Sequence, residues 1–186
     1  MRKKIKLVQA LYGAVILTIM MQPIAILGYS AYIWMMFMPL LLFFAFGANF
    51  KIIPSMILSY GCGIGWALIN GLFVGLLSGF INPIAANALA PVVIIFCILT
   101  VHENLLEDTV VGNVPALFMG LASTFFTFLV QPANAPTLTP IHLIAIFIYG
   151  VLMSVVLAGG GFALCRAIFG ETETLKAFTP KEREAH

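Results

Sequence analysis

Charged residues are rare in this chain and are confined to a few short clusters. Its nine Lys and Arg residues and seven Asp and Glu residues leave residues 7–50, 52–102 and 109–165 entirely uncharged. A transmembrane helix needs about 20 predominantly apolar residues, so each stretch could supply more than one. Of all residues, 62% are hydrophobic and 9% are charged, against roughly 45–50% and about 25% in soluble domains. The sequence therefore predicts an all-α fold, a polytopic membrane helix bundle whose main partner is the lipid bilayer.

Apolar runs and the turn residues between them predict about six transmembrane helices. Clusters of proline and asparagine, as at residues 81–83 and 131–136, do not continue a helix and mark loops. We expect residues 1–170 to form a single transmembrane domain and residues 171–186 to form a short polar cytoplasmic tail. The expected helices cover residues 7–27, 31–48, 52–77, 84–101, 111–130 and 141–169.

The basic residues predict the orientation, because Lys and Arg near helix ends favour the cytoplasmic side. With residues 2–6 inside, six helices also place Lys51 and every basic residue from Arg166 onward inside, so both termini are cytoplasmic. Five helices would place Arg166 and the basic residues after it outside. A cleaved signal peptide ending near residues 28–30 is another alternative, but this apolar run is longer than the about 7–15 residues of a secretory core.

Small residues recur every four positions in three of the predicted helices. Such spacing lets helix backbones approach closely in lipid, and it predicts packing within the bundle or between protomers. Three consecutive glycines at 159–161 are costly in a helix and indicate a kink, a hinge or a very close contact. The glycines expected to pack are Gly61, Gly65, Gly71, Gly75, Gly79, Gly120, Gly150 and Gly160.

The predicted spans offer few groups for chemistry. None has an Asp, Glu, Lys or Arg well inside it, and such residues usually mark proton relays and ion pathways in membranes. There is no His-Glu-x-x-His zinc motif, and the three cysteines suggest neither a metal site nor a disulfide framework. His102 lies by a predicted cytoplasmic turn and is not expected to be catalytic. We expect no enzyme activity, no metal, no cofactor and no nucleic-acid partner.

Uncharged polar side chains are the remaining candidates for function. Gln22, Asn70 and Gln131 lie in the outer third of three predicted helices. A buried amide is unfavourable in hydrocarbon unless it is hydrogen-bonded, so these amides should face one another, broken backbone or water. The alternative is that they only join neighbouring helices. The candidate residues for a solute pathway are Gln22, Asn70, Gln131, Tyr60, Thr124 and Ser154.

Three stretches carry a resemblance to a known family. They are residues 114–126 (VPALFMGLASTFF), residues 63–67 (GIGWA) and the glycine-rich last helix before Arg166. This pattern resembles a family of small bacterial inner-membrane proteins, domain of unknown function 1097. The resemblance implies several spans in a bacterial inner (cytoplasmic) membrane. The resemblance assigns no catalytic residue to this chain.

The uncharged spans, the glycine ladders and the outer amides together lead to a functional hypothesis. We expect a small channel or facilitator for an uncharged or weakly charged small solute, assembled as a homo-oligomer. The alternative is a non-transporting assembly or accessory subunit that binds a partner membrane protein, because small-residue faces also suit contacts between proteins.

Overall fold

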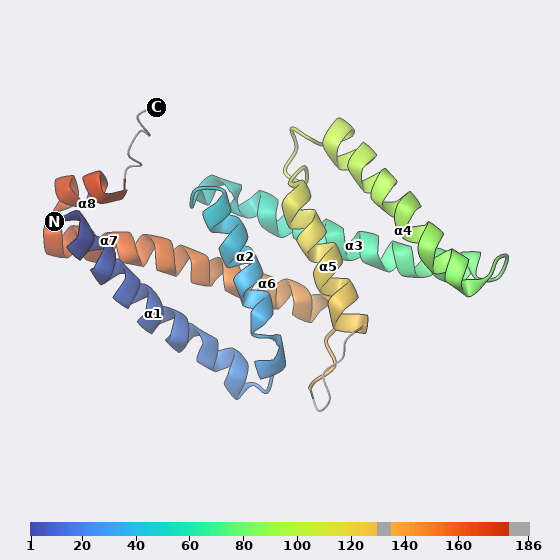
Figure 1. Ribbon diagram of the computed structural model, residues 1–186, viewed down its shortest axis with the longest axis horizontal. Helices are drawn as coiled ribbons and strands as arrows, with labels where there is room; N and C mark the ends of the chain where they lie inside the picture. Colours follow the sequence, from blue (N-terminus) through green and yellow to red (C-terminus); the bar gives the residue numbers. More distant parts are fainter. Residues whose placement is uncertain (130–134, 179–186) are drawn as a thin grey trace. The chain divides into compact units, whose positions relative to one another are not determined.

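The computed structural model describes residues 1–129 and 135–178, and all regular secondary structure in these residues is helical. This confirms the all-α prediction. Short 3-10 segments, η1 (Ser30–Tyr32) and η2 (Phe50–Ile52), and π-helical segments, η3 (Thr100–Leu105) and η4 (Val156–Gly160), adjoin the α-helices. The α-helices are α1 (Arg2–Ile26), α2 (Trp34–Ala45), α3 (Ile53–Leu77), α4 (Pro83–Leu99), α5 (Val114–Leu129), α6 (Pro140–Val155), α7 (Gly161–Phe169) and α8 (Glu171–Phe178) (Figure 1).

Four helical segments among the described residues are long and apolar enough to cross a membrane. They are Arg2–Ile26, Phe50–Leu77, Pro83–Leu105 and Pro140–Phe169. Two shorter apolar helices are Ser30–Ala45 and Val114–Phe128. Each of the six coincides with a predicted helix, apart from shifts at its ends. The length and apolar composition of these helices indicate that this chain is a membrane protein.

Side-chain caps explain where two of these segments begin. Pro83 is the first residue of α4, where the missing N–H would have had no partner inside the helix. The preceding Asn82 accepts a hydrogen bond from the Ile84 N–H at 2.8 Å through its Oδ1. Asn49 caps η2 in the same way, with its Oδ1 3.0 Å from the Lys51 nitrogen. Such caps satisfy N–H groups that a helix start leaves unpaired.

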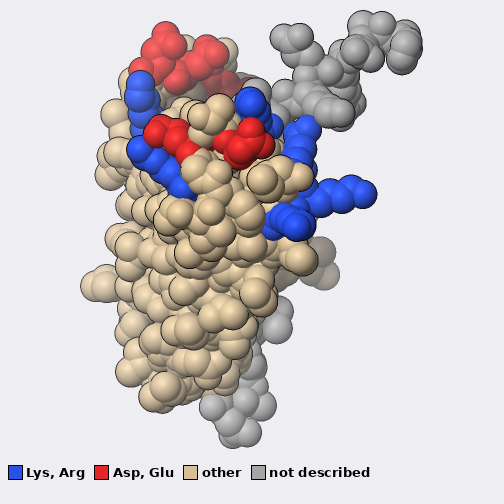
Figure 2. Space-filling view, turned by 90° about the vertical axis from the view of Figure 1, so that its left-hand side faces the viewer, with Lys and Arg blue, Asp and Glu red and all other residues tan. Residues whose placement is uncertain are grey.

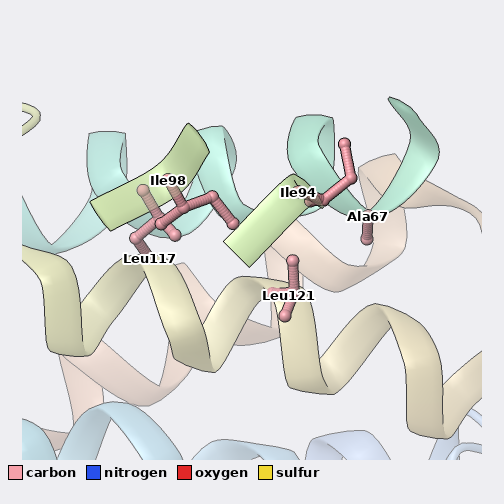
Figure 3. Close-up of a cluster of buried hydrophobic side chains, with 5 residues drawn as sticks. All are labelled: Ala67, Ile94, Ile98, Leu117 and Leu121. Carbon is pink, nitrogen blue, oxygen red and sulfur yellow. The ribbon is translucent and has the colours of Figure 1, made fainter. Parts of the chain in front are cut away.

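The chain divides into two compact units, each described here by itself. Residues 31–151 form the central unit, in which α3 packs against α4 and α5 and α2 packs against α5. The terminal unit consists of residues 1–30 and 152–186 and is built from α1, η4, α7 and α8. The single transmembrane domain over residues 1–170 stays a prediction. An apolar core cluster of the central unit consists of Ala67, Ile94, Ile98, Leu117 and Leu121 (Figure 3).

Two glycines let α3 and α5 approach closely in the central unit. A Cβ atom on Gly120 would overlap the carbonyl oxygen of Tyr60, and one on Gly63 would overlap the carbonyl oxygen of Leu117. Gly150 of α6 is equally confined, because its Cβ would lie 2.7 Å from the Met36 carbonyl oxygen of α2. Backbone atoms cannot move aside as a flexible side chain can, so these positions admit only glycine without a helix shift.

The glycine ladder of α3 lies on a different face. A Cβ on Gly61, Gly65, Gly71 or Gly75 would meet no described atom within 4 Å, and one on Gly79 would meet only the Leu76 carbonyl oxygen at 3.4 Å. Within the described chain it is Gly63 that contacts α5 closely. Gly63 lies between Gly61 and Gly65 and is not part of the four-residue spacing. Gly61 and Gly65 are each two residues from Gly63, and residues two apart point about 200° apart around a helix, which explains why these two glycines lie away from α5. Packing of this ladder against a second copy stays a prediction.

The triple glycine lies in the terminal unit, at the junction of η4 and α7. Gly160 touches the Tyr12 side chain so closely that a Cβ would overlap the hydroxyl. That hydroxyl donates a hydrogen bond to the Val156 carbonyl oxygen at 3.1 Å. A π-helical turn leaves carbonyl groups outside the regular α-helical pattern, and Tyr12 binds one of them. The triple glycine thus lies where the π-helical segment η4 meets α7, and its Gly160 is in close contact with Tyr12.

Part of the predicted polar tail is a helix packed onto the terminal unit. Residues 171–178 form α8, in which Thr174 and Ala177 are buried. Ala177 belongs to a small apolar cluster with Ile5 of α1 and Cys165 of α7. Among the described residues of this unit, charged side chains occur at positions 2–6, at Arg166 and in α8, and Figure 2 shows Lys and Arg side chains beside Asp and Glu side chains above an uncharged surface. This distribution suits a helix pair whose charged end lies in water and whose remainder lies in lipid.

Candidate functional site

A cavity of about 1130 Å³ lies in the central unit between α3, α4 and α5. Both α4 and α5 pack against α3 more than against each other, and this arrangement leaves space between them. Ala67 and Leu121, members of the core cluster in Figure 3, line the cavity beside that core. The described lining residues are Ala67, Leu68, Asn70, Gly71, Leu72, Val74, Asn87, Pro91, Phe118, Leu121, Ala122, Thr124, Phe125, Phe126 and Phe128.

Asn70 is the most deeply buried amide in this lining. Its side chain is 6% exposed, and its Oδ1 has no hydrogen-bond partner among the described residues. Most buried polar groups in proteins are hydrogen-bonded, so an exception calls for a physical explanation. Leaving an acceptor unpaired in a dry interior costs about 1–3 kcal/mol. Oδ1 itself exposes less than 1 Å² of surface, so the unpaired acceptor faces the interior of the central unit.

Two further polar groups line the cavity and are satisfied locally. The Thr124 hydroxyl donates to the Gly120 carbonyl oxygen of its own helix at 2.8 Å, and the Asn87 Nδ2 donates to the Pro83 carbonyl oxygen at 2.8 Å. None of the described lining residues is charged, and four are phenylalanines. The site is therefore suited to an uncharged molecule and offers no ion-pair partner to an ion.

The structure brings two of the six predicted pathway residues, Asn70 and Thr124, to this cavity. Tyr60 instead lies in the core of the central unit, 1% exposed and stacked on Phe147 with ring centroids 3.8 Å apart. Gln131 lies outside the described residues. The phenylalanines that line the cavity were not identified from the sequence, because their sequence pattern does not distinguish a cavity wall from a lipid-facing surface.

The other two predicted pathway residues belong to the terminal unit. Ser154 is fully buried there. Gln22 of α1 is exposed and donates from its Nε2 to the Thr18 carbonyl oxygen one turn earlier, at 3.1 Å. The predicted meeting of Gln22 with Asn70 stays a prediction.

A second, smaller cavity of about 560 Å³ lies in the central unit next to His102. Glu103 and Glu107 also line it, beside the start of α5. Among the described residues, no group of three or more His, Cys, Asp or Glu could hold a metal ion. This cavity is therefore the weaker candidate for a binding site.

His102, to which the sequence assigned no role, links three segments of the central unit. It is 3% exposed, and its Nε2 lies 3.1 Å from the indole nitrogen of Trp66. Because an indole N–H can only donate, Nε2 accepts, and Nδ1 donates to the Val111 carbonyl oxygen 2.9 Å away. The imidazole is thus neutral in this arrangement. It joins the end of α4 to α3 and to the segment before α5.

Comparison with known proteins gives one result. The family model described as "Protein of unknown function (DUF1097)" matches residues 7–162, which is most of the chain. No curated protein and no solved structure matches this chain. The match confirms the resemblance carried by residues 63–67, residues 114–126 and the glycine-rich last helix. This membrane protein therefore belongs to the DUF1097 family.

Proposed function

We propose that this protein is a small channel or facilitator for an uncharged small solute, which binds in the cavity between α3, α4 and α5. One observation carries the proposal: an uncharged, largely apolar cavity contains the buried Asn70 amide, whose Oδ1 lacks a partner among the described residues. Ligand sites are typically apolar cavities with a small number of polar groups that orient the ligand. A site of this kind favours neutral solutes because an ion would lose its hydration without gaining a counter-charge.

The proposed topology has six spans with both termini in the cytoplasm of a bacterial cell, and the proposed location is the inner membrane. The segments Ser30–Ala45 and Val114–Phe128 are then two of the spans, although they are shorter than the other four. At 1.5 Å per residue, helices of about 16 residues extend roughly 24 Å, close to a hydrocarbon core of about 30 Å. With six spans, every Lys and Arg is cytoplasmic, as the positive-inside rule favours.

Replacing Asn70 by Leu tests the cavity as part of the pathway. We expect the variant to fold, because the change removes an unpaired buried acceptor, and we expect solute flux to fall about tenfold, the effect of losing one hydrogen bond to the bound solute. Stopped-flow light scattering on proteoliposomes, with a panel of neutral solutes, measures this flux. Ser78→Ala is the control: Ser78 directly follows α3 and is not among the described lining residues, and its hydroxyl donates to the Val74 carbonyl oxygen at 2.8 Å. Unchanged flux in Asn70→Leu would contradict the proposal.

The rival function, a non-transporting accessory subunit, is favoured by a different observation. Gly61, Gly65 and Gly75 have no described atom within 4 Å of where a Cβ would lie and are not among the described cavity-lining residues, which leaves a small-residue face on α3 with no described neighbour. Small residues spaced in this way support helix association in membranes. The face suits a second copy, as in the proposed homo-oligomer, or a helix of a different protein.

A single substitution on that face tests self-association. Gly75→Leu is expected to convert an oligomer to a monomer while leaving the monomer folded, because the new side chain meets open space within the chain. Single-molecule photobleaching of labelled protein in liposomes counts the copies before and after the change. Oligomers that persist in Gly75→Leu would show that this face does not join protomers.

A further inference from the structure

The terminal unit carries more positive charge than its own acidic residues can neutralise. Residues 1–30 and 152–186 contain eight Lys and Arg residues against four Asp and Glu residues, so four positive charges are left over even if every acid is paired. The two acids of this unit that the structure describes already have partners, one in Arg166 at 2.8 Å and one in Lys176 at 3.2 Å. The excess charge therefore requires anions from outside this unit.

Two of the remaining cations, Lys3 and Lys4, lie at the start of α1 and have exposed side chains. Neither has an ion-pair partner among the described residues. The first turn of α1 also contains no acidic residue. Cations at this end of a helix are disfavoured, because the positive end of the helix dipole lies there. An anion at this position would offset both the lysine charges and the dipole.

An exposed apolar strip continues from the two lysines along α1. Residues three and four apart are neighbours on a helix surface, so Lys3 and Lys4 both adjoin Leu7, and Leu11 follows one turn later. Leu7 is 70% exposed and Leu11 is 66% exposed. Ile5 lies two positions before Leu7, about 200° around the helix, and is buried in the apolar cluster of the terminal unit. The strip thus faces away from that cluster and combines positive charge at one end with apolar surface along the next two turns.

We propose that this face of α1 binds an anionic phospholipid, with the phosphate group at Lys3 and Lys4 and an acyl chain along Leu7 and Leu11. Charge complementarity identifies the occupant, because basic residues beside the end of a membrane helix attract anionic headgroups. A free phosphate ion would leave the leucines uncovered, and a zwitterionic lipid would bring no net negative charge to the lysines. Long lysine side chains can place their methylene groups on apolar surface while the charged ends reach the headgroups. The inference goes beyond the proposed function, because it concerns the terminal unit and does not depend on transport.

Native mass spectrometry of the purified, delipidated protein in an uncharged detergent tests the inference by titration with three probes. Dioleoylphosphatidylglycerol has the anionic headgroup and the chains, dioleoylphosphatidylcholine has the same chains without net charge, and glycerol phosphate has the anionic group without chains. We expect the phosphatidylglycerol to bind at least about tenfold more tightly than either of the other two. Membrane orientation, which the same lysines influence, plays no part in a measurement on protein in detergent.

Two double variants locate the site. In Lys3→Gln/Lys4→Gln, the preference for phosphatidylglycerol over phosphatidylcholine should disappear. Glutamine forms helices about as well as lysine, and both side chains are exposed, so we expect this variant to fold. The matched control, Lys51→Gln/Lys176→Gln, removes the same net charge from η2 and α8 and should keep the preference.

Four outcomes would overturn the inference. The first three are equal affinity for the two lipids, glycerol phosphate that binds as tightly as phosphatidylglycerol, and a preference that survives in Lys3→Gln/Lys4→Gln. The fourth is an equal loss of the preference in both double variants, because it would show attraction to the overall charge of the protein instead of a site at the start of α1.

Discussion

Replacing Gly120 by alanine is expected to lower the free energy of unfolding by about 3 kcal/mol, at the upper end of typical overpacking effects. The added Cβ would overlap the Tyr60 carbonyl oxygen, and the α-carbon of Gly63 would be only 3.2 Å away. Both obstacles belong to the backbone of α3. The two helices must therefore move apart, which loosens the contact that positions α5 beside the cavity.

Titration with a denaturing detergent, followed by circular dichroism, measures this loss. Gly61→Ala on the same pair of helices is the matched control, because its Cβ would meet no described atom within 4 Å. Alanine is the better helix former by about 0.5–1 kcal/mol, so this control should be as stable as the natural protein or slightly more stable. Similar losses in Gly120→Ala and Gly61→Ala would show that the α3–α5 contact is not as close as described.

Replacing His102 by leucine is expected to lower the free energy of unfolding by about 2–4 kcal/mol. The change leaves the Trp66 indole N–H and the Val111 carbonyl oxygen without the partners that His102 now provides. Each buried group that loses its partner contributes about 1–3 kcal/mol. We therefore expect the end of α4 and the segment before α5 to become loose in the variant.

A double-mutant cycle with Trp66→Phe isolates the bond between the two rings. Phenylalanine removes the indole donor and keeps an aromatic ring in contact with the core cluster, against which Trp66 packs. Residues that share a hydrogen bond give interaction energies of about 0.5–3 kcal/mol in such cycles. Strictly additive effects of the two substitutions would contradict the proposed link between α3 and η3.

The helices could be predicted from the sequence because the length and polarity of a membrane span are fixed by the bilayer. Asn70 and Thr124 could be found for a related reason: a polar group in an otherwise apolar span needs a partner wherever it lies. The packing partners were harder to predict. The ladder of Gly61 and Gly65 defines a face of α3, but only the placement of α5 determines that Gly63 makes the contact.

Other features left no distinctive pattern in the sequence. A phenylalanine such as Phe125 occurs in the same sequence context whether it faces lipid, a core or a cavity. His102 is separated from Trp66 by 36 positions, so their hydrogen bond depends on how α3 and η3 are arranged. The burial of Ala177 in α8 was hidden by the charged residues around it, which are typical of a solvated tail.

The central claim is that solute passes through the cavity between α3, α4 and α5, and filling that cavity tests it most directly. Ala122 lines the cavity, whereas Ala88 is exposed on α4 outside the described lining. We would measure solute uptake by proteoliposomes containing the natural protein, Ala122→Trp or the control Ala88→Trp, beside empty liposomes. We predict uptake well above empty liposomes for the natural protein and for Ala88→Trp, and uptake at the empty-liposome level for Ala122→Trp. Uptake by Ala122→Trp equal to that of the natural protein, or no uptake by correctly folded natural protein, would contradict the claim.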